Sequence, residues 1–288
     1  MKLLVTGAGG MLGQTLSPYL AKRGHDVAAF GKEELDITDG DLVQQVLAEQ
    51  RPDLIVHCAA YTQVDQAETE QETAFAINER GTENVALAAS RLNIPMLFVS
   101  TDYVFDGSNN KPYKTDDPTG PISVYGKSKL AGELAVQRHC QNYYIVRTSW
   151  LYGPYGRNFV DTIYKLAQER DQIKVVADQV GSPTSTATLS EMIADLIASG
   201  RYGIYHATDE GITSWFDFAR EIVKDLEAKG KKVEVVPIET KDMPRPAPRP
   251  AYSALDKSDL IKALGRPLTP WQEALHQYMQ TQSVKAPA

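Results

Sequence analysis

The fold of this chain is decided by residues 2–13, which read Lys2-Leu3-Leu4-Val5-Thr6-Gly7-Ala8-Gly9-Gly10-Met11-Leu12-Gly13. A short apolar run that ends in glycines predicts a buried strand over Lys2–Thr6 and a tight turn after it. A helical pattern then runs from Met11 to Arg23, and Gly24 is a typical stop signal. Strand, turn and helix in this order predict the first unit of a parallel α/β sheet.

The glycine turn has the spacing of a phosphate-binding loop. Gly7 permits the tight turn, Gly10 lets the backbone approach a pyrophosphate, and Gly13 lets the helix pack against the strand. The helix N-terminus presents free N–H groups and a partial positive charge to the phosphates. A glycine-rich turn without a ligand is the alternative, but at the first strand-to-helix turn the pattern is specific. We therefore expect Gly7, Gly10, Met11, Leu12 and Gly13 to bind a dinucleotide.

The alternation of strands and helices continues to about residue 150. Strands are expected at His25–Phe30, Asp53–Cys58, Pro95–Ser100 and Tyr143–Arg147, and helices from Asp39 or Asp41 through Glu49, at Thr73–Leu92 and at Val124–His139. This spacing implies right-handed crossovers and an α/β, doubly wound parallel sheet of the Rossmann type. An eight-fold barrel would need eight similar units, and the rhythm stops after Trp150.

The second half of the chain is less regular. Its expected elements are helices at Asn158–Arg170 and Thr188–Ala198 and strands at Lys174–Ala177 and Gly203–Ala207. We expect a dinucleotide-binding domain over residues 1–150, with later strands returning to its sheet from about residues 173–207. Residues 151–288 would form mainly a smaller C-terminal substrate-binding lobe with an interleaved boundary. The polar residues Gln280–Ala288 are expected to fray.

Composition excludes several classes of protein. The 288 residues are 42% apolar and 23% charged, as in ordinary globular proteins. The net charge of -7 and the lack of a basic stretch argue against nucleic-acid binding. No apolar run approaches the ~20 residues of a membrane span, and no secretory signal is present, so we expect a cytoplasmic protein. Cys58 and Cys140 form no Cys-x-x-Cys pair, which argues against a zinc site.

The end of the second strand bears on the choice of cofactor. An acidic residue there would bind the adenosine ribose and favour NAD, but the sequence reads Phe30-Gly31-Lys32. Lys32 would pair with a 2′-phosphate, so we expect NADP(H), with NAD(H) as the alternative. Asp36 would hold the adenine amino group or belong to a loop that caps the next helix.

A second motif supplies acid–base chemistry. In Tyr125-Gly126-Lys127-Ser128-Lys129, the side chains of Tyr125 and Lys129 share one face of a helix. An ammonium group near a phenol is expected to lower the phenol pKa, and the Tyr can then donate a proton to an oxyanion. A lone Tyr-x-x-x-Lys is common by chance. Here Ser100-Thr101-Asp102 also follows the fourth strand, where open α/β sheets bind ligands, and Thr101 would bond a substrate carbonyl.

With these motifs the chain resembles the extended short-chain dehydrogenases/reductases and, among them, the dTDP-4-dehydrorhamnose reductase family. The resemblance covers nearly the whole chain, and its most specific parts are Ser100–Gly107 and the run to Trp150. Its carriers are Thr6–Gly13, His57–Asp65, Ala76–Asn78, Ser100–Gly107, Tyr125–Lys129, Arg147–Trp150, Asp178-Gln179, Gly181–Thr184, Arg249-Pro250 and Ser253.

The resemblance implies hydride transfer from NAD(P)H to the C4 keto carbon of dTDP-6-deoxy-L-lyxo-4-hexulose. Tyr125 would protonate the oxygen, Lys129 would orient the ribose and tune Tyr125, and Thr101 would bond the carbonyl. The cofactor would be lined by Ala59, Ala60 and Tyr61, and the sugar nucleotide by Val64, Asp65, Asp102, Trp150, Asn158 and Arg249.

Several of these residues have a second interpretation. The guanidinium of Arg249 matches a diphosphate, but it would also suit a surface loop. Trp150 would stack on a ring or fill the core between the lobes, and Asp65 would bind substrate or cap a helix. Some family members hold magnesium through a carboxylate on the first helix and use it in dimerisation. Here that position has Gln14 and Thr15, so no metal site is expected, and monomer and homodimer both stay open.

Two other functions compete with a reductase. A nucleotide-sugar dehydratase needs acidic residues beside the catalytic hydroxyl, but Asp102 follows Thr101 without an adjacent Glu. An epimerase of the same branch would keep its NAD bound. A non-catalytic regulatory subunit, like the β subunit of methionine adenosyltransferase, would share the fold alone. Because Thr101, Tyr125 and Lys129 are all present, catalysis is favoured.

Overall fold

The computed structural model describes residues 1–228 and 230–283 and has a six-stranded parallel sheet at its centre. The strand order is β10-β5-β4-β3-β1-β2, which reverses direction between β1 and β3. The strands are β1 (Lys2–Thr6), β2 (Asp26–Phe30), β3 (Leu54–His57), β4 (Met96–Thr101), β5 (Tyr143–Thr148) and β10 (Gly203–His206). This confirms the predicted doubly wound sheet, whose ligands are expected beside the reversal.

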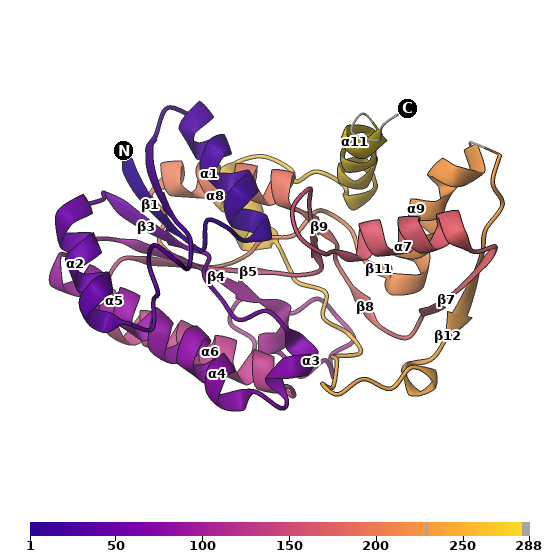
Figure 1. Ribbon diagram of the computed structural model, residues 1–288, viewed down its shortest axis with the longest axis horizontal. Coiled ribbons are helices and arrows are strands. Elements are labelled where there is room, and N and C mark those ends of the chain that lie inside the picture. Colours follow the sequence, from indigo (N-terminus) through magenta and orange to yellow (C-terminus); the bar gives the residue numbers. More distant parts are fainter. Residues whose placement is uncertain (229, 284–288) are drawn as a thin grey trace.

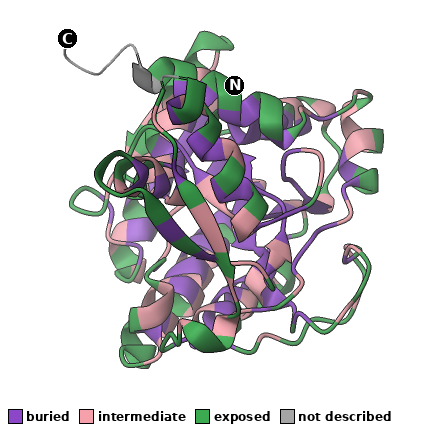
Figure 2. Ribbon diagram, turned by 90° about the vertical axis from the view of Figure 1, so that its right-hand side faces the viewer, coloured by how far each residue is buried: buried purple, intermediate pink, exposed green. Residues whose placement is uncertain are grey.

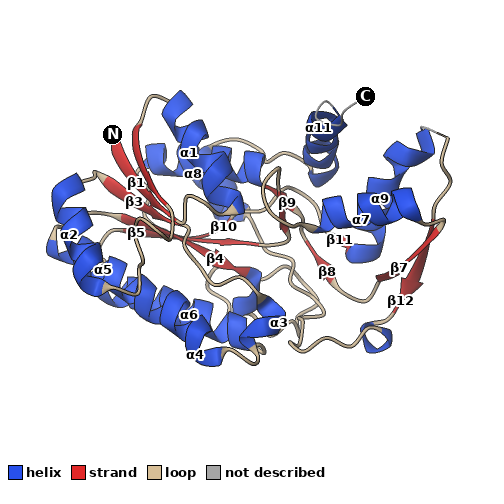
Figure 3. Ribbon diagram, in the orientation of Figure 1, coloured by secondary structure: helices blue, strands red, loops and turns tan. Residues whose placement is uncertain are grey.

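Helices cover both faces of the sheet, as Figure 3 shows. One face packs on α1 (Met11–Lys22), α8 (Thr186–Ser199) and α10 (Ser258–Leu264), and the other on α2 (Gly40–Gln50), α5 (Thr82–Arg91) and α6 (Val124–His139). Successive strand residues point to opposite faces, so Leu3 and Val5 lie in the first core and Leu4 in the second. Burial on both faces explains the unbroken apolar runs.

The long helix predicted over Thr73–Leu92 is interrupted. It consists of α4 (Gln71–Phe75), the π-helical turn η1 (Ala76–Gly81) and α5. A Cβ at Gly81 would lie 2.7 Å from Ile37, so glycine permits close packing inside the turn. Apolar periodicity does not reveal one extra residue in a helical turn, and such turns often occur near functional sites.

The remaining elements form a smaller lobe (Figure 1). Helices α7 (Phe159–Glu169), α9 (Trp215–Ala228) and α11 (Trp271–Ser283) pack with the parallel pair β7 (Gln172–Val176) and β12 (Glu234–Ile238). Short segments complete the described chain: α3 (Val64–Ala67), η2 (Asp102–Val104), β6 (Leu151–Tyr152), β8 (Val180–Gly181), β9 (Thr184–Ser185), β11 (Thr213–Ser214) and η3 (Thr240–Asp242). Figure 2 looks onto this lobe and shows exposed residues along the outer sides of its helices.

Two expectations about the second half need correction. Of the two strands expected to return to the large sheet, β10 joins it, whereas β7 pairs with β12 in the smaller lobe. Local apolar alternation does not specify the partner of a strand. Fraying from Gln280 was also expected, but α11 continues to Ser283, and residues 284–288 lie outside the described chain. None of the described helices is long and apolar enough to cross a membrane.

Candidate active site

A cavity of about 730 Å³ lies where β1, β3, β4 and β5 end. It extends from the glycine turn, past the loop after β3, to the N-terminal part of α6. The predicted site residues that line it are Gly7, Gly10, Met11, Leu12, Gly13, Lys32, Asp36, Ala59, Ala60, Val64, Thr101, Asp102, Tyr125, Lys129 and Trp150. Tyr61, Asp65, Asn158 and Arg249 are not among its lining residues.

The glycine turn is packed too closely for larger residues. Gly7 has a φ of +67°, and a Cβ there would lie 2.5 Å from the Ala59 backbone nitrogen. A Cβ at Gly13 would lie 2.4 Å from the Gly7 carbonyl oxygen. Helix α1 begins after Gly10 with no side-chain cap and no acidic residue in its first turn. Its first N–H groups can therefore bind an anion, which fits the pyrophosphate of a dinucleotide.

The far end of the cavity holds the residues that bear on cofactor choice. Lys32 is exposed and lines the cavity beside Asp36. The Asp36 carboxylate accepts bonds from the Thr38 backbone N–H at 2.9 Å and the Thr38 hydroxyl at 2.7 Å. These bonds lower the pKa of Asp36. Asp36 thus stabilises the turn before α2, while Asp39 caps that helix.

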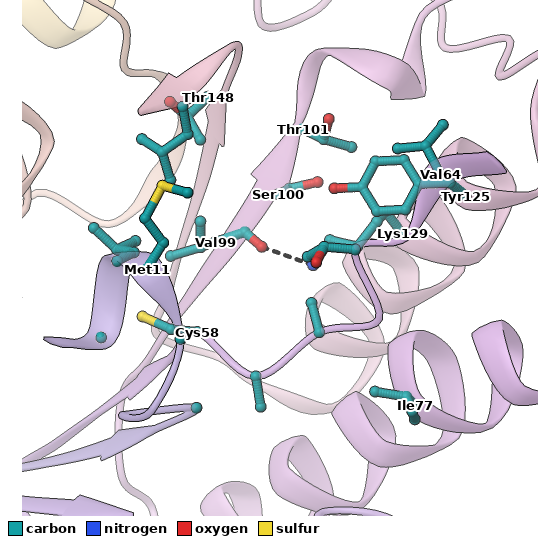
Figure 4. A pocket seen from close by; sticks show the side chains of 18 of the residues that line it. Met11, Cys58, Val64, Ile77, Val99, Ser100, Thr101, Tyr125, Lys129 and Thr148 are labelled. Atoms are coloured by element: carbon teal, nitrogen blue, oxygen red, sulfur yellow. Dashed lines mark hydrogen bonds between the residues drawn. The ribbon is translucent and has the colours of Figure 1, made fainter. Parts of the chain in front are cut away.

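Tyr125 lies in the first turn of α6, whose N-cap Ser123 accepts a bond from the Gly126 N–H at 3.1 Å. Figure 4 shows its hydroxyl directed toward Ser100 and Thr101 at the end of β4. Burial raises the pKa of Tyr125 to about 12, while a hydrogen bond with Thr101 acts in the opposite direction. The phenol is therefore protonated at neutral pH, as a proton donor must be.

The pKa of Tyr125 is raised in this structure, so the lowering expected from Lys129 is not seen. The Lys129 Nζ donates to the Val99 carbonyl oxygen at 2.8 Å and lies 3.9 Å from the centroid of the Phe98 ring. Burial lowers the pKa of Lys129 to about 7, with Glu133 opposing this shift. The spacing correctly put both side chains on one helix face, but it did not reveal the carbonyl that binds the ammonium.

Two cavity-lining hydroxyls were not predicted as site residues. Ser100 Oγ and Thr148 Oγ1 are buried and have no hydrogen-bond partner among the described residues. Both come from the ends of central strands, where polar residues follow apolar runs, and this was the signal that could have identified them. A buried hydroxyl without a partner is costly, so these groups are suited to bond a ligand.

Asp65 and Arg249 form an ion pair beside the cavity. Both guanidinium Nη atoms donate to the Asp65 carboxylate, and the Ala247 N–H donates to Asp65 Oδ1 at 3.2 Å. Asp65 is not the N-cap of α3, since Gln63 has that position. Arg249 is half-buried and also bonds Tyr103, which lines the cavity. Arg249 is therefore not an isolated surface cation.

Comparison with known proteins agrees with this site. The family described as RmlD substrate binding domain matches residues 1–284. The dTDP-4-dehydrorhamnose reductase of Streptomyces griseus is 46% identical over 278 residues, which cover 94% of this chain and 91% of that protein. The spore coat polysaccharide biosynthesis protein SpsK of Bacillus subtilis is 41% identical over 282 residues, 98% of each chain. The chain belongs to the RmlD family.

A solved structure supports the assignment. The dTDP-4-dehydrorhamnose reductase of Bacillus anthracis in complex with NADP superposes with a TM-score of 0.92 at 43% identity. The match covers 97% of this RmlD-family chain and 99% of that one. The names of the two reductases agree with the predicted class, an oxidoreductase that acts on a nucleotide-linked sugar.

In this RmlD-family chain, Trp150 packs against the core of the smaller lobe and also lines the cavity. It has a φ of +48°, lines the cavity and stacks on Trp215 with a centroid distance of 3.6 Å. Asn158 is buried and caps α7, accepting from the Asp161 N–H at 2.9 Å and donating to the Gly153 carbonyl at 2.9 Å. Its amide therefore holds the turn before α7 rather than facing the cavity.

Tyr61, predicted to line the cofactor, and Gln14, on the first helix, both form hydrogen bonds within the chain. The Tyr61 hydroxyl donates to Glu70 at 2.8 Å, and its backbone N–H donates to Asn78 Oδ1 at 2.8 Å, which fixes the loop after β3. Gln14, where some relatives were expected to have a metal-binding carboxylate, donates to the Gly9 carbonyl at 2.8 Å. Across residues 1–228 and 230–283, no group of three or more His, Cys, Asp or Glu side chains is placed to hold a metal ion.

Proposed function

We propose that this RmlD-family protein reduces the C4 keto group of dTDP-4-dehydro-L-rhamnose to give dTDP-L-rhamnose, with NADPH or NADH as reductant. The observation that carries the proposal is a single cavity lined by the glycine turn together with Thr101, Tyr125 and Lys129. The names of the relatives and the NADP complex of one of them support it.

The cofactor would be held mainly by the larger half of the chain. Its pyrophosphate would lie on the N–H groups at Met11 and Leu12, where Gly7 and Gly10 allow a close approach. Lys32, exposed at the far end, would attract a 2′-phosphate, which favours NADPH. When bound, the reduced nicotinamide supplies the hydride.

Three side chains would act on the sugar carbonyl. Thr101 would donate a hydrogen bond to the carbonyl oxygen in place of the bond that it now donates to Asp102 at 3.1 Å. As the C4 carbon gains the hydride, its oxygen becomes an alkoxide and takes the phenolic proton of Tyr125. Lys129 lines the same cavity, and its ammonium would bond the cofactor ribose and stabilise the phenolate that forms as the proton leaves. The products are the C4 alcohol and the oxidised cofactor, and solvent then returns a proton to Tyr125.

The sugar nucleotide would occupy the part of the cavity lined by Val64, Asp102 and Trp150. Burial raises the pKa of Asp102 to about 6, so this carboxyl can accept or donate a bond to a sugar hydroxyl near neutral pH. Arg249 would reach a diphosphate by exchanging one of its bonds to Asp65. Through Arg249, the lobe over residues 151–288 would take part in substrate binding.

The test is to follow reduced nicotinamide absorbance while the purified protein is mixed with NADPH or NADH and the 4-keto sugar nucleotide, made in place from its precursor. We expect loss of one reduced cofactor per dTDP-L-rhamnose formed, with NADPH preferred. Turnover of a different keto-sugar nucleotide would support the reductase activity but contradict the proposed substrate. Cofactor binding without oxidation of any keto-sugar nucleotide would instead support an epimerase or a regulatory subunit.

A further inference from the structure

A buried acidic residue continues the row formed by Tyr125 and Lys129. The three residues Tyr125, Lys129 and Glu133 are spaced at i, i+4 and i+8 along α6, so their side chains share one face. Lys129 is 2% exposed and Glu133 1% exposed. Tyr125 and Lys129 line the cavity, whereas Glu133 is not among its lining residues. A carboxylate is thus buried one helical turn behind the ammonium.

The Glu133 carboxylate is fixed by Arg147 of β5. Arg147 Nε donates to Glu133 Oε1 at 2.9 Å, and Arg147 Nη2 donates to Glu133 Oε2 at 2.7 Å. The guanidinium is held in turn by the Thr115 carbonyl oxygen at 3.3 Å and lies 5.1 Å from the Phe105 ring centroid. With both oxygens bonded from one side, the carboxylate has one well-defined position relative to Lys129.

The other groups around Lys129 do not supply a comparable negative charge. On its own helix it faces Tyr125 and Glu133, and from the end of β3 it faces His57 and Cys58. Burial lowers the pKa of His57 to about 3 and raises that of Cys58 to about 12, so both are neutral at pH 7. Asp102 interacts with Tyr125 but is not among the groups that shift the pKa of Lys129. The structure therefore makes Glu133 the principal anion near the buried ammonium.

We propose that Glu133, held in place by Arg147, is a positioning residue that keeps Lys129 charged at the cavity. Burial disfavours the ammonium form, and the carboxylate one turn away offsets this effect. The consequence for turnover rests on the proposed function, but the charge on Lys129 can be measured without any substrate.

The direct test uses protein labelled with ¹³C at the lysine Cε, with the Lys129 signal assigned by its loss in Lys129→Met. In the wild type we expect Lys129 to titrate near pH 7. In Glu133→Gln the midpoint should fall by about one pH unit, since loss of a nearby opposite charge disfavours the charged form. An unchanged midpoint would overturn the proposal.

The matched control is Glu83→Gln. Glu83 also forms ion pairs with α6, to Arg138 at 3.3 Å and His139 at 2.9 Å, but these lie at the far end of that helix from Lys129. The same substitution there should leave the Lys129 midpoint in place. Glu133→Asp keeps the negative charge, so its Lys129 midpoint should lie close to the wild-type value.

Glu133→Gln leaves Arg147 buried without its partner and can fail to fold. The double variant Glu133→Gln with Arg147→Met removes both charges and retains similar volume. It should fold, as judged by circular dichroism, and is compared with Arg147→Met, which lacks the same cation but keeps the carboxylate. The Lys129 midpoint of the double variant should be the lower of the two by about one pH unit, and equal midpoints would contradict the proposed role of the carboxylate.

Turnover gives an independent measurement. In Glu133→Gln, the alkaline limb of the pH profile of kcat should move to lower pH by about one unit, as the Lys129 midpoint does. Lowering the assay pH by about one unit should therefore restore much of the lost rate. A purely structural role would lower kcat equally at every pH. If the wild type does not oxidise NADPH with any keto-sugar nucleotide, the proposed function fails, while the lysine titration still decides the role of Glu133.

Discussion

The carboxyl edge of the six-stranded sheet and the core of the smaller lobe bury their side chains in opposite ways. At the sheet edge, Ser100 Oγ and Thr148 Oγ1 are buried without a partner in the described chain, and the buried Lys129 Nζ donates to the Val99 carbonyl oxygen. In the smaller lobe, Phe218 packs on Trp271 and Phe159 with centroid distances of 5.5 and 5.6 Å. The sheet edge keeps its free hydroxyls at the wall of a cavity, and the core of the smaller lobe is filled mainly with rings.

This difference indicates that the two regions serve different purposes, ligand binding at the sheet edge and stability in the core of the smaller lobe. Buried polar groups without partners destabilise the folded chain, yet they can bond a ligand without rearrangement. Aromatic clusters stabilise through burial and ring contacts and offer little to a polar ligand. We infer that the aromatic core of the smaller lobe contributes stability while the sheet edge supplies chemistry, so substitutions in the two regions should have different effects.

The largest effect is expected for Tyr125→Phe at the sheet edge. Removing the proton donor should lower kcat by about 10²–10⁴-fold, the usual contribution of general acid catalysis. Cofactor affinity should stay near the wild-type value, because the glycine turn is unchanged. Steady-state oxidation of NADPH and a fluorescence titration of the cofactor measure the two quantities.

Tyr202→Phe serves as the matched control for Tyr125→Phe. Tyr202 is 44% exposed, is absent from the cavity lining and contacts the ring of Tyr144. Its variant should turn over at the wild-type rate. A Tyr125→Phe enzyme with intact turnover would remove Tyr125 from the mechanism and leave the proton donor to be found elsewhere.

The sheet edge is also the region that sequence reasoning predicted best. Residues 2–13 and 125–129 are contiguous motifs, so their spacing alone fixes a turn and a helix face. The ends of parallel strands meet at one edge, which brought Thr101 to the same place. The raised pKa of Tyr125 was not predictable in this way, because it depends on burial and on the charge of Asp102.

The smaller lobe was predicted less well because its contacts join distant segments. Asp65 and Arg249 are separated by 184 positions, and no local pattern links them. The pairing of β7 with β12 likewise depends on a partner far along the chain. Asn158 was assigned to the substrate by resemblance, whereas its helix-capping contacts become evident only once α7 is placed. Residue type indicated polarity there, but not the partner.

The next largest effect is expected for Phe218→Ala in the smaller lobe. Phe218 is fully buried among aromatic rings, so truncation should lower the free energy of unfolding by about 3–5 kcal/mol. Urea denaturation measures this loss. Cofactor affinity of the folded fraction should change little, because the cofactor cavity is lined by other residues.

Phe216→Ala on the same helix is the matched control. Phe216 is half-buried and contacts Arg220 at 5.7 Å from its ring centroid, so its truncation leaves a much smaller cavity and should cost less stability. If the two variants were equally destabilised, the aromatic cluster around Phe218 would not be the principal source of stability in this lobe.

The smallest effect is expected for Lys32→Met, which tests how the sheet edge selects its cofactor. Lys32 is exposed, so its attraction for a 2′-phosphate is weakened by solvent and should be worth about tenfold in NADPH affinity. NADH has no such phosphate and should bind equally to both proteins. Lys22→Met, on α1 away from the cavity lining, should change neither affinity.

Because a screened charge pair weakens with salt, the NADPH preference of the wild type should also shrink as ionic strength rises. Equal loss of NADPH and NADH affinity in Lys32→Met would mean that this lysine supports the loop after β2 and does not recognise the 2′-phosphate.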